Sequence, residues 1–178
     1  MLYMFLAEGF EETEAIGALD VIRRANIPIK TVSIGEPLVT GSHGISVKAD
    51  ILKRELSFED MEGIILPGGL PGTTNLKNDS EVQKAIKYCH KNGLLLAAIC
   101  AAPMVLGELG VLDGKNATCY PGYEDTLKGA TPTGEAATSD GNTVCGKGAG
   151  ASMLFGAKIV DYFKPGEGRK ILDLMQHA

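Results

Sequence analysis

The chain has 178 residues, of which 44% are hydrophobic and 22% charged, and its formal net charge is −5 at pH 7. This length suits one globular domain with a substantial core. The acidic balance argues against a nucleic-acid partner, which needs a basic face, and no apolar run approaches the roughly 20 residues of a membrane-spanning helix.

The N-terminal half predicts strands that alternate with helices. The start, residues 1–7, has no basic leader or cleavage pattern and is interpreted as a first strand rather than a signal peptide. Residues 70–78 are interpreted as a glycine- and asparagine-rich connector. We expect strands over residues 2–7, 29–34 and 63–66, weaker β structure around residues 38–39 and 45–51, and helices over residues 11–25 and 81–92.

Three carboxylates gather in the first turn of the first helix, where they suit the helix dipole. Continuing the apolar stripe of residues 15–25 backwards places Glu11 near its middle and Glu14 at its edge, with Glu12 on the side away from it. At least one carboxylate is therefore expected to face the sheet, and periodicity does not choose between Glu11 and Glu14. The alternative is three solvated glutamates at a helix start.

Residues 94–99 form an apolar run without alternation, typical of a central parallel strand that is covered on both faces. Pro103 is tolerated in the first turn of a helix but not in its interior, so a helix should begin close to Cys100. Cys100 is therefore predicted at the carboxyl end of a central strand, where open α/β sheets place their chemistry. A helix N-terminus there favours the thiolate. The alternative is a buried structural cysteine.

Pro67-Gly68-Gly69 ends the strand of residues 63–66, which is expected to adjoin the Cys100 strand. The two glycines permit a sharp turn and leave backbone amides free to point into a cleft. The amides of Gly69 and Ala101 could then form an oxyanion site. The alternative is a plain tight turn.

The C-terminal half continues the alternation of strands and helices. Cys119 and Tyr120 alternate along one predicted strand, so one of them should face inward. The whole pattern predicts one three-layer α/β sandwich with a largely parallel sheet. After Cys100 we expect a helix over about 104–109, a strand over 116–120, loop and short helix over 123–135, a hairpin from 136–139 and 143–146, a helix over 147–163, and an amphipathic turn or two over 169–175.

The cysteines and histidines limit the chemistry. The cysteines lie far apart without a C-x-x-C pair, which argues against a zinc site or disulfides and favours the cytoplasm. No histidine follows Cys100 where a partner strand would present a base, so a Cys–His hydrolase is poorly supported. His43 is expected in a surface loop. A buried, protonated glutamic acid remains as the group that could hold a thiolate, or a sulfinate after oxidation.

Three motifs together resemble the ThiJ/PfpI superfamily, most closely its deglycase (DJ-one) branch with bacterial relatives. They cover nearly the whole chain in the right order and read Glu11-Glu12-Thr13-Glu14, Leu66-Pro67-Gly68-Gly69 and Ala98-Ile99-Cys100-Ala101-Ala102-Pro103. The resemblance implies a flavodoxin-like three-layer α/β/α sandwich, a single class I glutamine amidotransferase-like domain over residues 1–178, with a nucleophile elbow. It also implies a homodimer.

By motif position, the resemblance implies that Glu14, not Glu11, faces Cys100, and that Gly69 and Ala101 supply the oxyanion amides. Ala101 stands where the protease-like branch has a histidine, so peptidase activity is not expected. Tyr120 stands where the deglycase branch often has a histidine. A phenol is a poor base near neutral pH but can donate a hydrogen bond, so glyoxalase-type proton shuttling is weakened.

The resemblance implies an enzyme of the glyoxalase or deglycase type (a hydrolase or lyase) that uses no metal or other cofactor. Cys100 would add to the aldehyde of methylglyoxal or to an early glycation adduct, Glu14 would move the proton, and Glu11 and Tyr120 would support them. The alternative is a non-enzymatic redox sensor or chaperone, in which Glu14 stabilises a sulfinate on Cys100. A degenerate site with a structural cysteine is the third hypothesis.

Overall fold

The computed structural model describes residues 1–177. The helices are α1 Glu12–Arg24, α2 Gly72–Asn78, α3 Ser80–Asn92, α4 Pro103–Glu108, α5 Ser152–Phe163 and α6 Glu167–Leu174. The strands are β1 Leu2–Leu6, β2 Ile29–Ser33, β3 Leu38–Thr40, β4 Ser46–Lys48, β5 Ile51–Leu52, β6 Gly63–Leu66, β7 Leu95–Ile99, β8 Asn116–Ala117, β9 Thr131–Pro132, β10 Ala137–Asp140 and β11 Thr143–Gly146.

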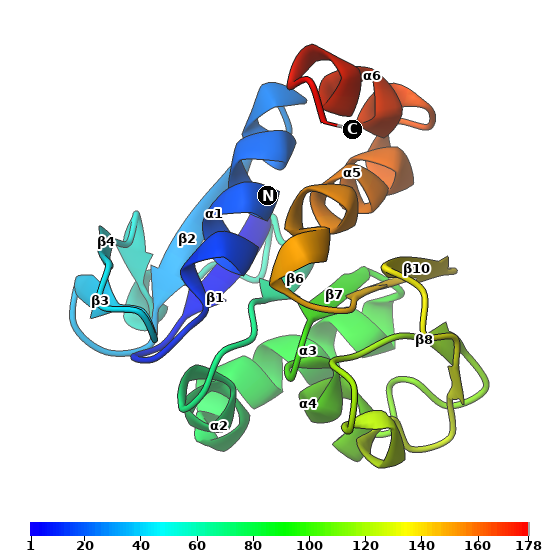
Figure 1. Cartoon of the computed structure of the whole chain (residues 1–178). Coiled ribbons are helices and arrows are strands. Elements are labelled where there is room, and N and C mark those ends of the chain that lie inside the picture. The colour runs from blue at the N-terminus through cyan, green and yellow to red at the C-terminus, as the bar shows by residue number, and fades with distance from the viewer. Residues whose placement is uncertain (178) are drawn as a thin grey trace.

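Seven strands form the central sheet, in the order β10-β11-β7-β6-β1-β2-β5 (Figure 1). Neighbouring strands are parallel except β10 and β11, which form the predicted antiparallel hairpin. The flavodoxin-like α/β fold with a mostly parallel sheet is therefore confirmed. No helix among residues 1–177 is long and apolar enough to cross a membrane.

Helices cover both faces of the sheet, which explains the apolar runs without alternation. In β1, Leu2, Met4 and Leu6 pack into the core beneath α1 and α5. Tyr3 and Phe5 pack into the other core, beneath α3 and α4. All five residues of β7 are fully buried, as expected for a strand between two helical layers.

The segment at residues 70–78 was predicted as a connector, and this prediction was wrong because residues 72–78 form α2. Its Gly-, Thr- and Asn-rich sequence has low helix propensity, but tertiary contacts stabilise the helix. The amide of Thr73 donates to the carbonyl of Gly69 at 2.8 Å. Gly72 packs so closely on Phe10 that a Cβ there would lie 2.6 Å from the Phe10 nitrogen.

The prediction of a strand over residues 116–120 was also wrong, because the observed strand is shorter. Only Asn116 and Ala117 form β8, which pairs with β9 outside the main sheet. The expected alternation still holds, because Cys119 is buried whereas Tyr120 is 51% exposed.

The carboxyl ends of β1, β6 and β7 lie at one edge of the sheet. The chain adds β2 on one side of β1 and β6 on the other, and α/β folds bind ligands at the edge beside such a reversal. Leu66 of β6 is paired with Ala98 of β7, so the turn after β6 comes level with Cys100.

Candidate active site

Cys100 lies at a sharp turn between β7 and α4, in the predicted position. Its φ angle is 66°, in the left-handed region that residues other than glycine and asparagine rarely adopt. The Cys100 amide donates to the carbonyl of Gly146 at 2.9 Å, and its carbonyl accepts from the amide of Tyr120 at 2.8 Å. These bonds hold the strained backbone and leave the thiol half-buried at the carboxyl edge of the sheet.

Glu14 projects from the first turn of α1 toward this turn and is 1% exposed. Its Oε2 atom accepts a hydrogen bond from the amide of Gly68 at 2.8 Å. Its Oε1 atom is buried without a hydrogen-bond partner of ordinary geometry. Gly68 lies against both Oε2 of Glu14 and the Cβ of Cys100, and the carboxyl and the thiol each shift the pKa of the other. The structure therefore places Glu14 beside Cys100.

Gly68 makes this approach sterically feasible. A Cβ on Gly68 would lie 2.6 Å from the Cβ of Cys100 and 2.6 Å from Oε2 of Glu14, closer than any real side chain could be. In the sequence, the Pro67-Gly68-Gly69 motif indicates free backbone amides. In the structure, Gly68 also leaves the space that lets the side chains of Glu14 and Cys100 approach each other.

Burial governs the acid–base properties of the pair. It raises the pKa of Glu14 to about 7, and the Glu11 charge adds to this, while the contacts with Cys100 and Gly68 lower it. The pKa of Cys100 is raised to about 12, mainly by burial. The charge of Glu14 and its hydrogen bond to the thiol raise it further. The amides of Ala101 and Gly69 lower it. The carboxyl of Glu14 therefore loses its proton first, near neutral pH, while the Cys100 thiol keeps its own.

This balance differs from the expectation that a helix N-terminus would favour the thiolate at Cys100. Helix α4 has only six residues, and desolvation of the sulfur together with the neighbouring carboxyl outweighs the two amides that contact it. Periodicity within one segment does not report how deeply a thiol is buried by other segments.

A pocket of about 210 Å³ opens above the sulfur, lined by Gly69, Leu70, Cys100, Ala101, Tyr120 and Tyr123. It brings together the nucleophile, the two amide-bearing residues and Tyr120, all of which were singled out from the sequence. Leu70 and Tyr123 were not, because each lies in a loop whose course depends on the fold. Gly69 has a φ angle of 86°, so its glycine is needed for the turn that brings its amide to the pocket.

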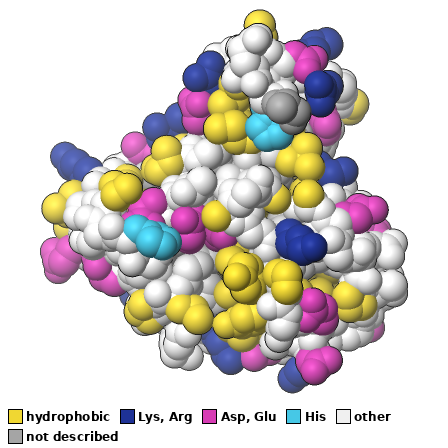
Figure 2. Space-filling model, viewed as in Figure 1, with side chains coloured by type: hydrophobic (Ala, Val, Ile, Leu, Met, Phe, Trp, Pro, Cys, Tyr) yellow, Lys and Arg dark blue, Asp and Glu magenta, His cyan; other side chains and the backbone are white. Residues whose placement is uncertain are grey.

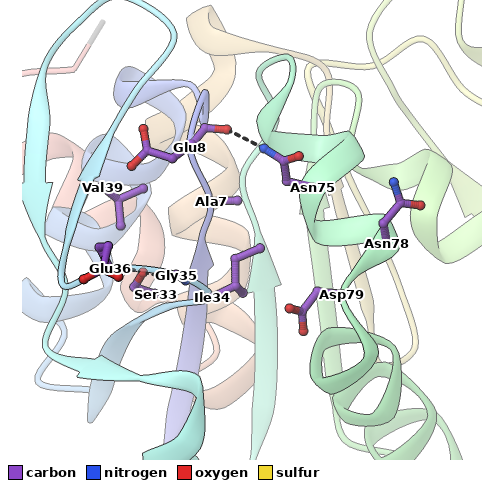
Figure 3. Close-up of a pocket in the computed structure, with 10 residues that line it drawn as sticks. All are labelled: Ala7, Glu8, Ser33, Ile34, Gly35, Glu36, Val39, Asn75, Asn78 and Asp79. Carbon is purple, nitrogen blue, oxygen red and sulfur yellow. Dashed lines mark hydrogen bonds between the residues drawn. The ribbon is translucent and has the colours of Figure 1, made fainter.

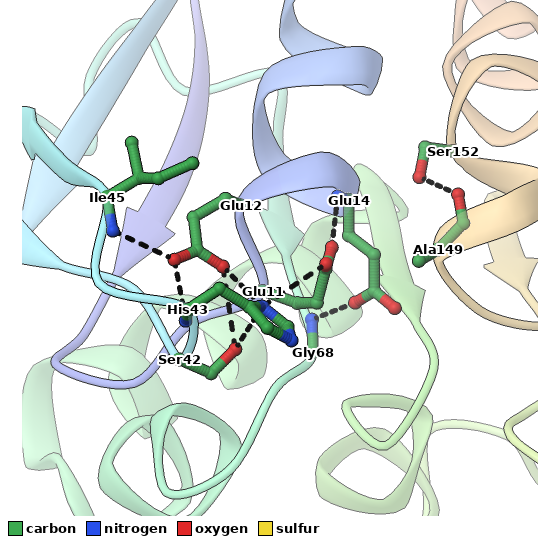
Figure 4. A network of polar contacts seen from close by, with 9 residues as sticks. All are labelled: Glu11, Glu12, Glu14, Ser42, His43, Ile45, Gly68, Ala149 and Ser152. Atoms are coloured by element: carbon green, nitrogen blue, oxygen red, sulfur yellow. Dashed lines mark hydrogen bonds and ion pairs between the residues drawn. The ribbon is translucent and has the colours of Figure 1, made fainter.

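Glu11 does not point at Cys100. It is the N-cap of α1: its Oε2 atom accepts from the amide of Glu14 at 2.6 Å, and its own amide donates to the carbonyl of Gly68 at 2.9 Å. Glu11 therefore fastens the start of the helix to the turn after β6 (Figure 4). Of the two carboxylates that periodicity left open, Glu14 is the one that faces the cysteine.

Glu12 faces away from the sheet as predicted, yet it is only 5% exposed. The loop between β3 and β4 covers it: its carboxylate accepts from the amides of His43 at 2.8 Å and Ile45 at 3.2 Å, and contacts Nδ1 of His43 at 2.9 Å (Figure 4). Burial alone would raise the pKa of Glu12, but these hydrogen bonds outweigh it and lower the pKa to about 2.

His43 is exposed, as expected for a surface loop, but it has an unforeseen partner in Glu12, which raises the pKa of the imidazole. Ligand atoms of Glu11, Glu12 and His43 lie within 4.8 Å of one another, close enough to share a metal ion. Each carboxylate is already used, however, since Glu11 caps α1 and Glu12 holds the loop. The three side chains lie close together because Glu12 holds the loop between β3 and β4 against α1.

A second pocket, of about 330 Å³, lies at the carboxyl ends of β1 and β2 (Figure 3). Asn75 of α2 donates to the carbonyl of Glu8 at 2.9 Å at its rim. The carboxylates of Glu8, Glu36 and Asp79 line it. It contains none of the residues singled out from the sequence.

The other three cysteines are poor nucleophiles. Cys89, Cys119 and Cys145 are at most 4% exposed, and burial raises their pKa values to about 12, 11 and 12 respectively. Cys89 packs in the core, as its helical spacing predicted. Cys100 is the one cysteine of the four with an accessible sulfur.

Residues 1–162 match the model of the DJ-1/PfpI family. The protein DJ-1 homolog B of Arabidopsis thaliana is 37% identical over 159 residues, which is 88% of this chain but 36% of that protein. The chain thus spans little more than a third of that relative. A deglycase of Pyrococcus horikoshii is 32% identical over 128 residues, covering 71% of this chain and 76% of that protein.

Among solved structures, an oxidized DJ-1 of Toxoplasma gondii superposes with a TM-score of 0.94. The two sequences are 28% identical, and the superposition covers 99% of this chain and 98% of the other. The two chains therefore share the complete fold.

Proposed function

The chain belongs to the DJ-1/PfpI family, and on that premise we propose that it acts on reactive α-dicarbonyls or early glycation adducts through Cys100 and Glu14. The observation that carries the proposal is the contact between the two side chains at the pocket. A carboxyl with a pKa of about 7 is suited to accept and return a proton near neutral pH. The deglycase name of the Pyrococcus relative supports the substrate class.

The chemistry begins when the sulfur of Cys100 attacks the aldehyde carbon of methylglyoxal and Glu14 takes the thiol proton. The amides of Gly69 and Ala101 donate toward the sulfur, and they stabilise the negative charge that develops on the aldehyde oxygen. Protonation of that oxygen gives a hemithioacetal.

Glu14 then completes the reaction as a proton carrier. Its carboxylate removes the proton from the former aldehyde carbon to form an enediol, which is reprotonated at the adjacent carbon to give a thioester of lactate. Water hydrolyses the thioester, releasing lactate and restoring the thiol. The net reaction adds one water to methylglyoxal, so no external oxidant or reductant is required. With a glycation adduct, the sulfur would displace the amine or thiol at the former aldehyde carbon: the new C–S bond forms as the bond to the leaving group breaks, and the leaving group takes up the thiol proton through Glu14.

Incubation of the protein with methylglyoxal, followed by an assay for lactate, tests this proposal. Lactate should form with the unmodified protein and with Cys89→Ala, whose sulfur lies in the core far from the pocket. It should not form with Cys100→Ser. Equal lactate production by Cys100→Ser, or none by the unmodified protein across a panel of dicarbonyls, would refute the proposal.

A second candidate function is redox sensing or chaperone activity, in which Cys100 is oxidised to a sulfinate. The favouring observation is the buried Oε1 atom of Glu14, which has no ordinary hydrogen-bond partner. A proton on that atom could be donated to a sulfinate oxygen. The similar Toxoplasma protein has been solved in an oxidized form. Intact mass after mild peroxide should show two added oxygens, located on Cys100; oxidation spread over several cysteines would contradict it.

We further propose a homodimer, on family grounds, and a location in the cytoplasm, because the four cysteines lie far apart without a C-x-x-C pair. Sedimentation equilibrium of the full chain tests the first, and a monomer at micromolar concentration would contradict it. Fractionation of cells that express the chain tests the second.

A further inference from the structure

The surface around the Cys100 pocket is apolar and unusually exposed. Leu70 is 52% exposed and Tyr120 is 51% exposed, and both line the pocket. Tyr120 packs edge to face on Tyr123, with ring centroids 6.4 Å apart. Figure 2 shows apolar side chains gathered on this face of the molecule, below the carboxylates and histidine near the start of α1. An apolar rim around a nucleophile is a surface that a ligand can desolvate.

Tyr120 separates this pocket from a neighbouring hollow. That hollow, of about 460 Å³, is lined by Tyr120, Pro121, Ala136 and residues 147–151. The ring of Tyr120 lies close over Gly148, where a Cβ would be 3.4 Å from its Cδ2 atom. The phenol ring therefore stands between the sulfur site and additional apolar space. A substituent larger than a methyl group has room to lie along the ring.

The charges around the pocket favour an uncharged substrate. None of its six lining residues carries a charge apart from the ionisable Cys100, and Glu14 and Cys100 together hold a negative charge near neutral pH. Lys147 borders only the neighbouring hollow, and its Nζ atom donates to the carbonyl of Gly134 at 3.0 Å. A carboxylate-bearing aldehyde would thus meet no cation, and a carboxylate product would be repelled.

We infer that the Cys100 pocket selects neutral α-oxoaldehydes and related α-carbonyl electrophiles that carry an aromatic substituent, and that Tyr120 is the residue that determines this selectivity. The aromatic ring of the ligand packs on the phenol ring of Tyr120 and on Leu70 while the carbonyl carbon lies at the sulfur. Aromatic pairs of this kind alter binding by up to about tenfold. The inference builds on the proposed function, because it names the substrate class of the same site.

The selectivity can be measured without turnover, from alkylation of Cys100 by two matched reagents. Phenacyl bromide and bromoacetone each form a bond from the sulfur to the reagent's methylene carbon, with loss of bromide and of the thiol proton. The rate ratio of phenacyl bromide to bromoacetone, from mass spectrometry, is divided by the same ratio for glutathione. We expect a normalised ratio of about ten.

Variants assign the effect to the ring. Tyr120→Ala should lower the normalised ratio to about one, whereas Tyr120→Phe should retain it, since the hydroxyl is not needed. Tyr162→Ala, which removes a tyrosine that is 38% exposed on α5, should leave it unchanged. A ratio near one in the unmodified protein, or a ratio unaffected by Tyr120→Ala, would overturn the inference.

A turnover assay with phenylglyoxal and methylglyoxal separates this inference from the proposed function. If the protein turns over neither compound, the proposed function fails, while the alkylation ratio still decides the selectivity. If it turns over both, kcat/KM should be about tenfold higher for phenylglyoxal. A preference for methylglyoxal would contradict the inference and leave the proposed function standing.

Discussion

The carboxyl of Glu14, in the first turn of α1, interacts directly with the thiol of Cys100 at the end of β7, and the contact lowers the pKa of the acid while it raises that of the thiol. The two residues lie in distant parts of the sequence and meet because parallel strands bring the segments that follow them to one edge of the sheet. Burial raises the pKa of Glu14 to about 7, so the pair loses its first proton from this carboxyl near neutral pH.

Gly68→Ala tests whether the space between these side chains is needed. The added methyl group would lie 2.6 Å from both Cys100 and Glu14, so we expect a loss of about 1–3 kcal/mol in the free energy of unfolding from overpacking. Urea denaturation measures this loss. Gly35→Ala is the matched control, because a Cβ there meets nothing within 4 Å. Equal stability of the two variants would contradict the packing described here.

Glu14→Gln tests the buried carboxyl through the pH dependence of stability. The folded state raises the Glu14 pKa from 4.5 to about 7, so it binds this proton more tightly than the unfolded chain does. The stabilising contribution is complete below about pH 4.5 and is lost as the pH rises to about 7.

Gln at this position does not titrate. As the pH rises from about 4.5 to about 7, the free energy of unfolding of the variant should therefore increase by up to about 3 kcal/mol relative to that of the unmodified protein. Denaturation at about pH 4 and about pH 8 provides the comparison. If the difference in the free energy of unfolding between the two proteins does not change with pH, the pKa of Glu14 is not raised in the folded state.

Glu12→Gln tests the fastening of the β3–β4 loop. The folded state lowers the pKa of Glu12 from 4.5 to about 2, so its stabilisation is present above about pH 4.5 and is lost as the pH falls toward 2. We expect the free energy of unfolding of the variant to be about 1–2 kcal/mol lower at neutral pH, since hydrogen bonds to a charged carboxylate are replaced by neutral ones. Glu36→Gln serves as the control. If both variants unfold alike at neutral pH, Glu12 does not hold the loop.

Local sequence patterns predicted most of the fold. Uninterrupted apolar runs identified β6 and β7, and Pro103 located the start of α4. Helix α2 escaped prediction because its stability comes from contacts of Gly72 with Phe10 rather than from helix-forming residues. The predicted strand extended beyond β8 because Thr118 and Cys119, which follow Ala117, are buried without pairing in a sheet.

The site was predictable in part. The position of Cys100 followed from the strand–helix pattern, but periodicity alone left Glu11 and Glu14 as equal candidates. The pairing of Glu12 with His43 joins residues of different segments, which no local spacing reports. Likewise, the raised pKa of Cys100 arises from burial by several segments, whereas the sequence showed only the helix terminus.

The central claim is that Glu14 governs the ionisation of Cys100, and the pH dependence of Cys100 alkylation by iodoacetamide tests it most directly. The other cysteines, whose pKa values burial raises to about 11 or 12, will not interfere near neutral pH. In the unmodified protein the rate should rise with an apparent pKa of about 7, where the pair loses its first proton.

In Glu14→Gln this rise should disappear, and the rate should increase only at the higher pH where the buried thiol ionises by itself. Identical pH profiles for the two proteins, with Cys100→Ser as the blank, would contradict the claim.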